Sequence, residues 1–448
     1  MSGRKQYAQW NRDEFDPDTL VDRLEKLRKP DPAGGQGIAF EGNFIFDDGI
    51  TILERAIDFK VIVPERDQRI IVRNALFAAA ESRPLSAGSL LGEVNRRTRA
   101  FAEAAEKEFL LATSLSVPYF EELGESEYKV SECRITIDYQ LPEPLRVGHK
   151  IAKERMRGFV FGEYPELGSS SLRSYAAVYV SVRGRSEFES ASRALEALDL
   201  LRGMWNLSLN RRTWRRTTNG RRRPINEVLL GPVHSLHSPD GSFASGVDWY
   251  EYDYVEPIRS KKFREHWERT KREENGIQAC LARNAYRSKL EDALRKYTRA
   301  LDTREWDSGF VLMWGLLEDL TGTRPGESHD ATVKRAAFLY SESERDLHVQ
   351  VLNHLRGYRN ASVHRGEGSE DIETYLYQLK RYVEDALKFH LENSYGFSSI
   401  EEAARFLDQP PELENLDRKI SDLQREVEKT QEKIRLAELA RQFHGQQS

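Results

Sequence analysis

Cysteine is scarce in this chain of 448 residues: there are two, Cys133 and Cys280, far apart and outside any CxxC pattern. This excludes a zinc site built from cysteines and makes a disulfide framework improbable. Long apolar runs are also missing. The first 25 residues lack the apolar segment of a signal peptide, and no run approaches the ~20 residues that cross a bilayer. We therefore expect a cytoplasmic protein that does not contact membranes.

An excess of charge of one sign is lacking too. The chain has 68 basic and 73 acidic residues, a formal net charge of −5. Nothing global favours nucleic-acid binding, so such a function must come from local patches. Hydrophobic residues make up 39% of the chain and charged residues 31%. This balance and the length predict a folded protein of two or three domains.

The first part of the chain predicts a mixture of helices and strands. Asp16 and Pro17 predict the start of a helix over Pro17–Lys29, and residues 1–37 are interpreted as this helix and a linker. Residues 38–260 are interpreted as an α+β recognition or sensor region of one or two subdomains. Expected strands are in Ile38–Val63, Glu127–Gln140 and Tyr175–Val182, and expected helices are Gln68–Ser82, Ser89–Leu115 and a segment after Ser186.

From residue 261 the strand patterns stop and helical patterns repeat. Residues 261–409 are interpreted as an all-α bundle of successive helices with short connections. A capping box of Ser399 and Glu402 opens the last of them. The expected helices are Ala282–Thr303, Ser308–Thr321, Ala331–Ser341, Glu344–Val363, Asp371–Ser394 and Ser399–Asp408.

The tail, residues 410–448, carries a heptad pattern. Apolar residues recur every seven positions from Leu413 to Ile434, and a second series three residues later runs from Leu416 to Ala437. The pattern favours a coiled coil. Thr430 and Ala437 weaken it, so an amphipathic helix that folds back on the chain is an equal alternative.

One segment combines residues suited to phosphodiester chemistry: Arg-Asn-Ala-Ser-Val-His, residues 359–364, at the end of an expected bundle helix. Asn360 and His364 are four residues apart and share a helix face, with Arg359 beside Asn360. Histidine moves protons near neutral pH, arginine holds a phosphorane, and asparagine orients either group. No convincing carboxylate cluster for a metal accompanies them.

This segment resembles the R-x(4–6)-H motif of HEPN-domain ribonucleases, in the form R-N-x-x-x-H. An upstream helix around Trp314–Leu320 carries an acidic residue in an aliphatic context, as in that family. The similarity to the ApeA-like group of prokaryotic anti-phage defence proteins covers roughly residues 280–395 and, less specifically, 170–255. Some ApeA-like proteins carry a cysteine zinc motif, which this chain cannot form.

The resemblance implies a metal-independent endoribonuclease without a cofactor. Two motifs meet across a homodimer, and the ribose 2′-OH attacks the adjacent phosphate to leave a cyclic phosphate. Arg359, Asn360 and His364 would be the active residues, and Glu318 the acidic neighbour that orients Arg359. Such proteins act in abortive infection, so we expect restraint by the N-terminal region until a trigger, a phage component, engages it. The alternative is a non-catalytic adaptor that uses the bundle and tail to dimerise and bind RNA.

An arginine stretch is the second candidate for RNA contact. No acidic residue occurs between Asp199 and Glu227, and arginines surround one tryptophan. Such residues neutralise phosphates and stack on a base; the alternative is a solvated loop. The candidate nucleic-acid-binding residues are Arg211, Arg212, Trp214, Arg215, Arg216, Arg221, Arg222 and Arg223.

His234, His237 and Asp240 have a spacing that suggests a metal site. Because the neighbouring prolines indicate a loop and no further ligand is evident, we expect a hydrogen-bonded turn and no bound metal.

Overall fold

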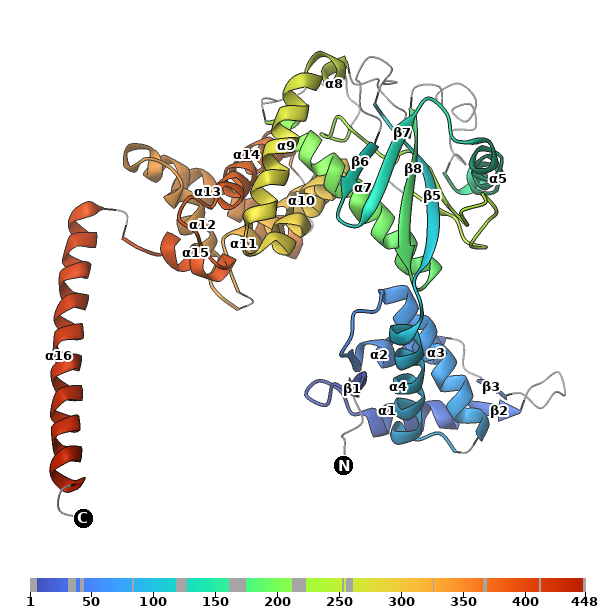
Figure 1. Ribbon diagram of the computed structural model, residues 1–448, viewed down its shortest axis with the longest axis horizontal. Helices are drawn as coiled ribbons and strands as arrows, with labels where there is room; N and C mark the ends of the chain where they lie inside the picture. The colour runs from blue at the N-terminus through green and yellow to red at the C-terminus, as the bar shows by residue number, and fades with distance from the viewer. Residues whose placement is uncertain are drawn as a thin grey trace. The chain divides into compact units, whose positions relative to one another are not determined.

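The computed structural model describes residues 6–30, 38–40, 44–82, 84–117, 127–160, 175–211, 223–251, 254, 261–324, 326–365, 369–410 and 412–445 (Figure 1). The chain forms two compact units. The α/β unit comprises Met1–Leu198 and Leu230–Arg259, and the helical unit comprises Asp199–Leu229 and Ser260–Ser448. The predicted α+β class with a mostly helical C-terminal region is thus confirmed. In the described ranges, no helix has the length and apolarity to span a membrane.

The α/β unit begins with elements that enclose a hydrophobic core of their own. They are β1 (Ala8–Trp10), α1 (Pro17–Lys26), β2 (Arg28–Pro30), β3 (Ile38–Phe40), α2 (Phe44–Arg55), β4 (Ile57–Phe59), α3 (Glu65–Ser82) and α4 (Ala87–Glu103). Ala8 of β1 pairs with Phe59 of β4, and Leu24 of α1 is buried in the same core. The expected boundary at residue 37 therefore divides residues that share one core.

Helix α1 starts where Asp16 predicts. The Asp16 carboxylate accepts hydrogen bonds from the backbone N–H groups of Asp18 and Thr19, which are among the donors that a helix start leaves unpaired. The helix ends at Lys26, three residues before the predicted Lys29, because β2 pairs with β3.

The prediction of strands throughout Ile38–Val63 is wrong in its middle, where α2 forms. Phe46, Ile50 and Leu53 recur at helical spacing and pack in the same core. The β-branched and aromatic residues of this segment favour strands by propensity, and burial of one helix face overrides that preference.

A six-stranded antiparallel sheet forms the second part of the α/β unit. Its order is β10 (Trp249–Tyr250), β9 (Val233–His237), β5 (Lys107–Leu115), β8 (Ala176–Gly184), β7 (Cys133–Asp138) and β6 (Glu127–Val130). The helices α5 (Glu143–Val160) and α7 (Glu187–Asn210) follow β7 and β8. The predicted strand Tyr175–Val182 is confirmed. The predicted strand Glu127–Gln140 is a hairpin, because the chain turns at Ser131, whose φ is 53°.

Helices α5 and α7 cover opposite faces of this sheet. Ala112 and Tyr179 stand opposite each other on β5 and β8 and pack with Leu145 of α5. Cys133, which the register places on the other face, contacts α7 through its Sγ, 3.7 Å from the carbonyl oxygen of Arg193. The sheet is therefore the middle of three layers.

The predicted helix Ser89–Leu115 is wrong in its second half, which is the strand β5. Helix α4 ends at Glu103, and the backbone of Ala104 is already extended. β5 lies between β8 and β9, and its last five residues are all buried. A strand buried on both faces lacks the polar–apolar alternation that distinguishes a strand from a helix in sequence.

Successive helices build the helical unit, as the sequence predicts. They are α8 (Lys261–Glu265), α9 (Trp267–Arg283), α10 (Arg287–Asp302), α11 (Trp306–Leu320), α12 (His329–Phe338), α13 (Glu342–Arg365), α14 (Ile372–Glu392), α15 (Ile400–Leu407) and α16 (Leu413–Gly445). The capping box is half formed. Ser399 accepts a hydrogen bond from the N–H of Glu402 (3.2 Å), but the Glu402 carboxylate reaches Ser398 instead of Ser399.

The second half of α7 also belongs to this unit, which therefore begins well before the predicted residue 261. Arg202 of α7 is fully buried and donates to both carboxylate oxygens of Asp302 (3.2 and 2.9 Å). Lys380 of α14 donates to the carbonyl oxygen of Asn210 (2.9 Å) and to Glu384 (2.8 Å). These partners are far apart in sequence, so the local pattern does not reveal the boundary.

Helix α16 carries the heptad as one exposed helix. Between residues 413 and 442 every side chain is exposed except the half-buried Leu416. Ile420 is 52% exposed and Val427 is 54% exposed. Within the described residues, the helix does not fold back on its own chain.

Candidate active site

The Arg-Asn-Ala-Ser-Val-His motif forms the end of α13. Leu355 and Leu352, one and two turns before Arg359, are fully buried and anchor the helix in the unit. Arg359 and Asn360 are half-buried, so their polar ends are accessible to a ligand. His364 lies in the last turn of the helix, and its side chain lies outside the described residues.

Arg359 and Asn360 interact with each other. Nη1 of Arg359 donates to Oδ1 of Asn360 over 3.4 Å. Among the described residues no carboxylate pairs with Arg359. Because a guanidinium has five N–H donors, this single long bond leaves capacity for an anionic ligand such as a phosphate.

Tyr358, next to the motif, is held by the first turn of α11. Its hydroxyl donates to Oδ1 of Asp307. Its ring meets the ring of Phe310 edge-on, with 5.0 Å between centroids, and lies 5.2 Å from the ring of Tyr375 on α14. Contacts to two neighbouring helices thus fix the backbone position of Arg359.

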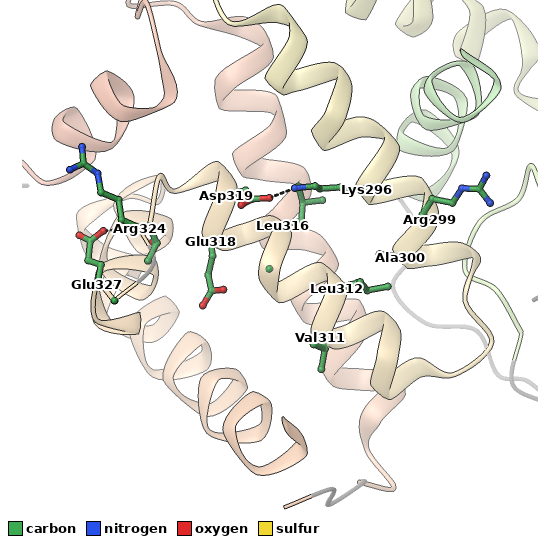
Figure 2. Close-up of a pocket in the computed structure, with 13 residues that line it drawn as sticks. Lys296, Arg299, Ala300, Val311, Leu312, Leu316, Glu318, Asp319, Arg324 and Glu327 are labelled. Atoms are coloured by element: carbon green, nitrogen blue, oxygen red, sulfur yellow. Dashed lines mark hydrogen bonds and ion pairs between the residues drawn. The ribbon is translucent and has the colours of Figure 1, made fainter. Parts of the chain in front are cut away.

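Glu318 lies elsewhere on α11. It is eleven residues after Asp307, about 16 Å along the helix axis, and its carboxylate accepts a hydrogen bond from Nε1 of Trp314 (2.8 Å). Glu318 lines a groove of about 640 Å³. The ion pair of Lys296 and Asp319 also lines this groove (Figure 2). The structure therefore gives Glu318 a partner other than Arg359.

A second acidic residue of α11, Asp307, lies close to the motif, and no sequence pattern singles it out. It occupies the first turn of α11 and bonds the residue next to Arg359. The sequence carries no signal that pairs Asp307 with Tyr358, since their contact depends on how two helices pack.

Most of the arginine stretch lies outside the described residues: Arg212, Trp214, Arg215, Arg216, Arg221 and Arg222. Its two ends are described. Arg211 is exposed at the end of α7, and the carbonyl oxygen of Arg223 accepts a hydrogen bond from Nε1 of Trp306 (3.0 Å). Trp306 precedes Asp307, so one end of the stretch is attached to the turn that holds the motif.

His234 and His237 lie on the strand β9 rather than in a loop, and both are buried. His234 contacts Thr113 through Nδ1 (2.6 Å) and Glu251 through Nε2 (3.1 Å). Asp240 belongs to the turn that follows and accepts a hydrogen bond from the N–H of Ser242 (3.0 Å). In the part of the chain that the structure describes, no three His, Cys, Asp or Glu residues are grouped to hold a metal ion.

A buried relay joins His237 to a third histidine. The Ser235 hydroxyl lies 2.8 Å from Nδ1 of His149 and 2.8 Å from Nε2 of His237. Burial lowers the pKa of His149 well below its ordinary value and also lowers the pKa of His237. These histidines are neutral hydrogen-bonding groups that join α5 to the sheet.

Comparison of the chain with models of protein families, with curated proteins and with solved structures found no match. A function must therefore be inferred from the residues and their arrangement. The end of α13 is accessible and cationic, whereas the histidine relay is enclosed.

Proposed function

We propose that the protein is a metal-independent endoribonuclease and that its helical unit is a HEPN-like bundle. The observation that carries the proposal is the half-buried Arg359–Asn360 pair on the last turns of a bundle helix that also contains His364. We further propose that the enzyme is a homodimer and serves anti-phage defence by abortive infection. In this proposal the α/β unit restrains the site until a phage component binds.

The chemistry follows from the three side chains. The ribose 2′-oxygen attacks the adjacent phosphorus, and His364 transfers the proton. Arg359 binds the charge that develops on the phosphorane, and its bond to Asn360 orients the guanidinium. The bond to the 5′-oxygen breaks, that oxygen takes up a proton, and the products are a 2′,3′-cyclic phosphate and a free 5′-hydroxyl.

Two further features support an RNA substrate. No carboxylate of the described residues neutralises Arg359, which leaves a positive site for a phosphate. The arginine stretch ends at Arg223, whose carbonyl group is bonded within the turn of Trp306 and Asp307. A phosphate bound at Arg223 would therefore lie near the first turn of α11.

The test is cleavage of total RNA by the purified chain in EDTA, with His364→Ala as the comparison. We expect cleavage without metal, products that end in a cyclic phosphate, and a loss of about 10²–10⁴ in rate for His364→Ala. A matched control is His354→Ala, a histidine two to three turns earlier on the same helix. Cleavage of a strand with 2′-deoxyribose at the scissile position would contradict the mechanism.

The second candidate function is a non-catalytic adaptor that binds RNA and dimerises. The exposed apolar seam of α16 favours it, because such a seam serves association and not catalysis. In that case RNA would be bound but remain intact, equally in the parent chain and in His364→Ala.

A further inference from the structure

Helix α16 has an apolar face that the described residues of its own chain do not cover. It has 33 residues and a length of about 50 Å. Helices in proteins derive most of their stability from packing an apolar face against a neighbour. In α16 that face is open: Leu413 is 78% exposed and Leu423 is 51% exposed.

The order of apolar residues specifies a type of pairing. Branched Ile or Val at position a with Leu at position d favours two parallel strands. The a positions of α16 are Leu413, Ile420, Val427 and Ile434, and the d positions are Leu416, Leu423, Thr430 and Ala437. Three of the four a positions are β-branched, and both leucines of the d series lie in the first two heptads.

The charges beside the seam are compatible with a second copy of this chain in parallel register. In that register each g residue faces the e residue of the next heptad on the other chain. Lys433 then faces Glu438 of the second copy. The two preceding pairs are Lys419 with Gln424 and Glu426 with Gln431. The parallel pairing has one attraction, Lys433 with Glu438, and one like-charge contact, Glu412 with Asp417 at the start of the helix.

The antiparallel alternative brings like charges together. With the seam fully overlapped, Lys419 faces Lys433 of the second copy, and Glu426 faces Glu426. The corresponding e positions pair Asp417 with Gln431 and give no compensating attraction. Like charges beside a seam select against a register.

We propose that residues 413–437 pair with the same segment of a second copy as a parallel, in-register, two-stranded coiled coil. Leu436 and Leu439 lie outside this seam. Helix α15 ends at Leu407, so a short connection joins each coiled-coil strand to its helical unit. This tether raises the effective concentration of one helical unit for the other, which, if the proposed function holds, assists pairing of two motifs.

Disulfide trapping in the full-length chain tests the proposal. The background is Cys280→Ser, since Cys280 is partly exposed and Cys133 is buried. Leu416→Cys and Ala437→Cys place a thiol at the d position near each end of the seam. Arg425→Cys is the matched control on the outer, f position of the same helix. The readout is covalent dimer on a non-reducing gel, which does not depend on any nuclease activity.

We expect Leu416→Cys and Ala437→Cys each to form a dimer about tenfold faster than Arg425→Cys, because only seam residues approach within disulfide distance. A mixture of Leu416→Cys with Ile434→Cys that gives chiefly the mixed disulfide would overturn the parallel register, because residues 416 and 434 face each other only in the antiparallel pairing. Equal rates at all three positions would show that no second copy covers the seam. Failure of RNA cleavage with normal trapping would reject the proposed function alone.

Discussion

The helical unit contains two polar regions that differ in burial. Lys380 is 2% exposed, and its charge is satisfied by Glu384 and the carbonyl oxygen of Asn210. Arg359 is half-buried and has one long hydrogen bond, to Asn360. A fully satisfied buried charge has no capacity for a ligand, and its role is to fix the packing of helices. Arg359, a cation with unused N–H donors near a helix end, has that capacity. We therefore propose a catalytic role for Arg359 and a stabilising role for Lys380.

The largest expected effect comes from breaking the buried pair. Lys380→Met should lower the free energy of unfolding by about 3–5 kcal/mol, because it leaves the carboxylate of Glu384 buried without its cation. The matched control is Lys388→Met on the same helix, whose pair with Glu392 has the same spacing but is about half exposed. That change should cost no more than about 1 kcal/mol. Urea denaturation compares the two, and equal losses would refute the distinction between buried and exposed pairs.

The complementary change is made at the motif. Arg359→Lys should lower the rate of RNA cleavage about 10²–10³-fold, because an ammonium cannot place two parallel donors on a phosphorane. The unfolding midpoint should stay unchanged, since Arg359 has no charged partner among the described residues. Arg356→Lys is the control: this arginine lies one turn earlier and pairs with Asp330. A comparable loss of activity in both variants would show that Arg359 has no special role in cleavage.

A third buried group, His390, should make the free energy of unfolding depend on pH. His390 is 1% exposed, donates from Nε2 to the carbonyl oxygen of Leu320 (2.6 Å) and accepts at Nδ1 from the Tyr286 hydroxyl (3.0 Å). Burial lowers its pKa to about 4. At pH 7 the ring is neutral in both the folded and the unfolded chain. As pH falls below about 6.5, the unfolded chain binds a proton that the folded chain does not.

The stability lost between pH 6.5 and 4 should approach about 3 kcal/mol for this residue. The measurement is the urea midpoint from pH 7 to 4 for the parent chain and for His390→Gln. The variant should show a shallower decline with pH. A decline of the same slope in both would show that His390 does not cause it, and that other groups, among them His149, His237 and His348, whose pKa values are also lowered, account for it.

The sequence predicts some helices and strands correctly and others wrongly. In both cases the outcome depends on whether burial leaves a visible hydrophobic period. Helices α10, α14 and α15 have one apolar face on a polar background, so their period is visible. β5 is buried on both faces and has no visible period, and α2 is rich in residues that favour strands. At the candidate site, Arg359 and Asn360 are neighbours in sequence, so the sequence alone shows the pair. Asp307 contacts Tyr358 only through packing of α11 against α13, which the sequence does not show.

The smallest expected effect tests that packing. Asp307→Asn keeps an oxygen that accepts from Tyr358 but removes its charge, which weakens the hydrogen bond by about 1 kcal/mol. We expect about a fivefold loss in kcat with KM unchanged, because Asp307 positions Arg359 through Tyr358 and does not itself touch RNA. Tyr358→Phe removes the bond and should lower kcat at least as much. The double variant should be no worse than Tyr358→Phe alone, since both changes act on the same bond. Asp319→Asn, at the other end of α11 and paired with Lys296, should leave kcat unchanged. Independent, multiplying losses in the double variant would show that Asp307 acts by another route, such as the long-range field of its charge on the RNA.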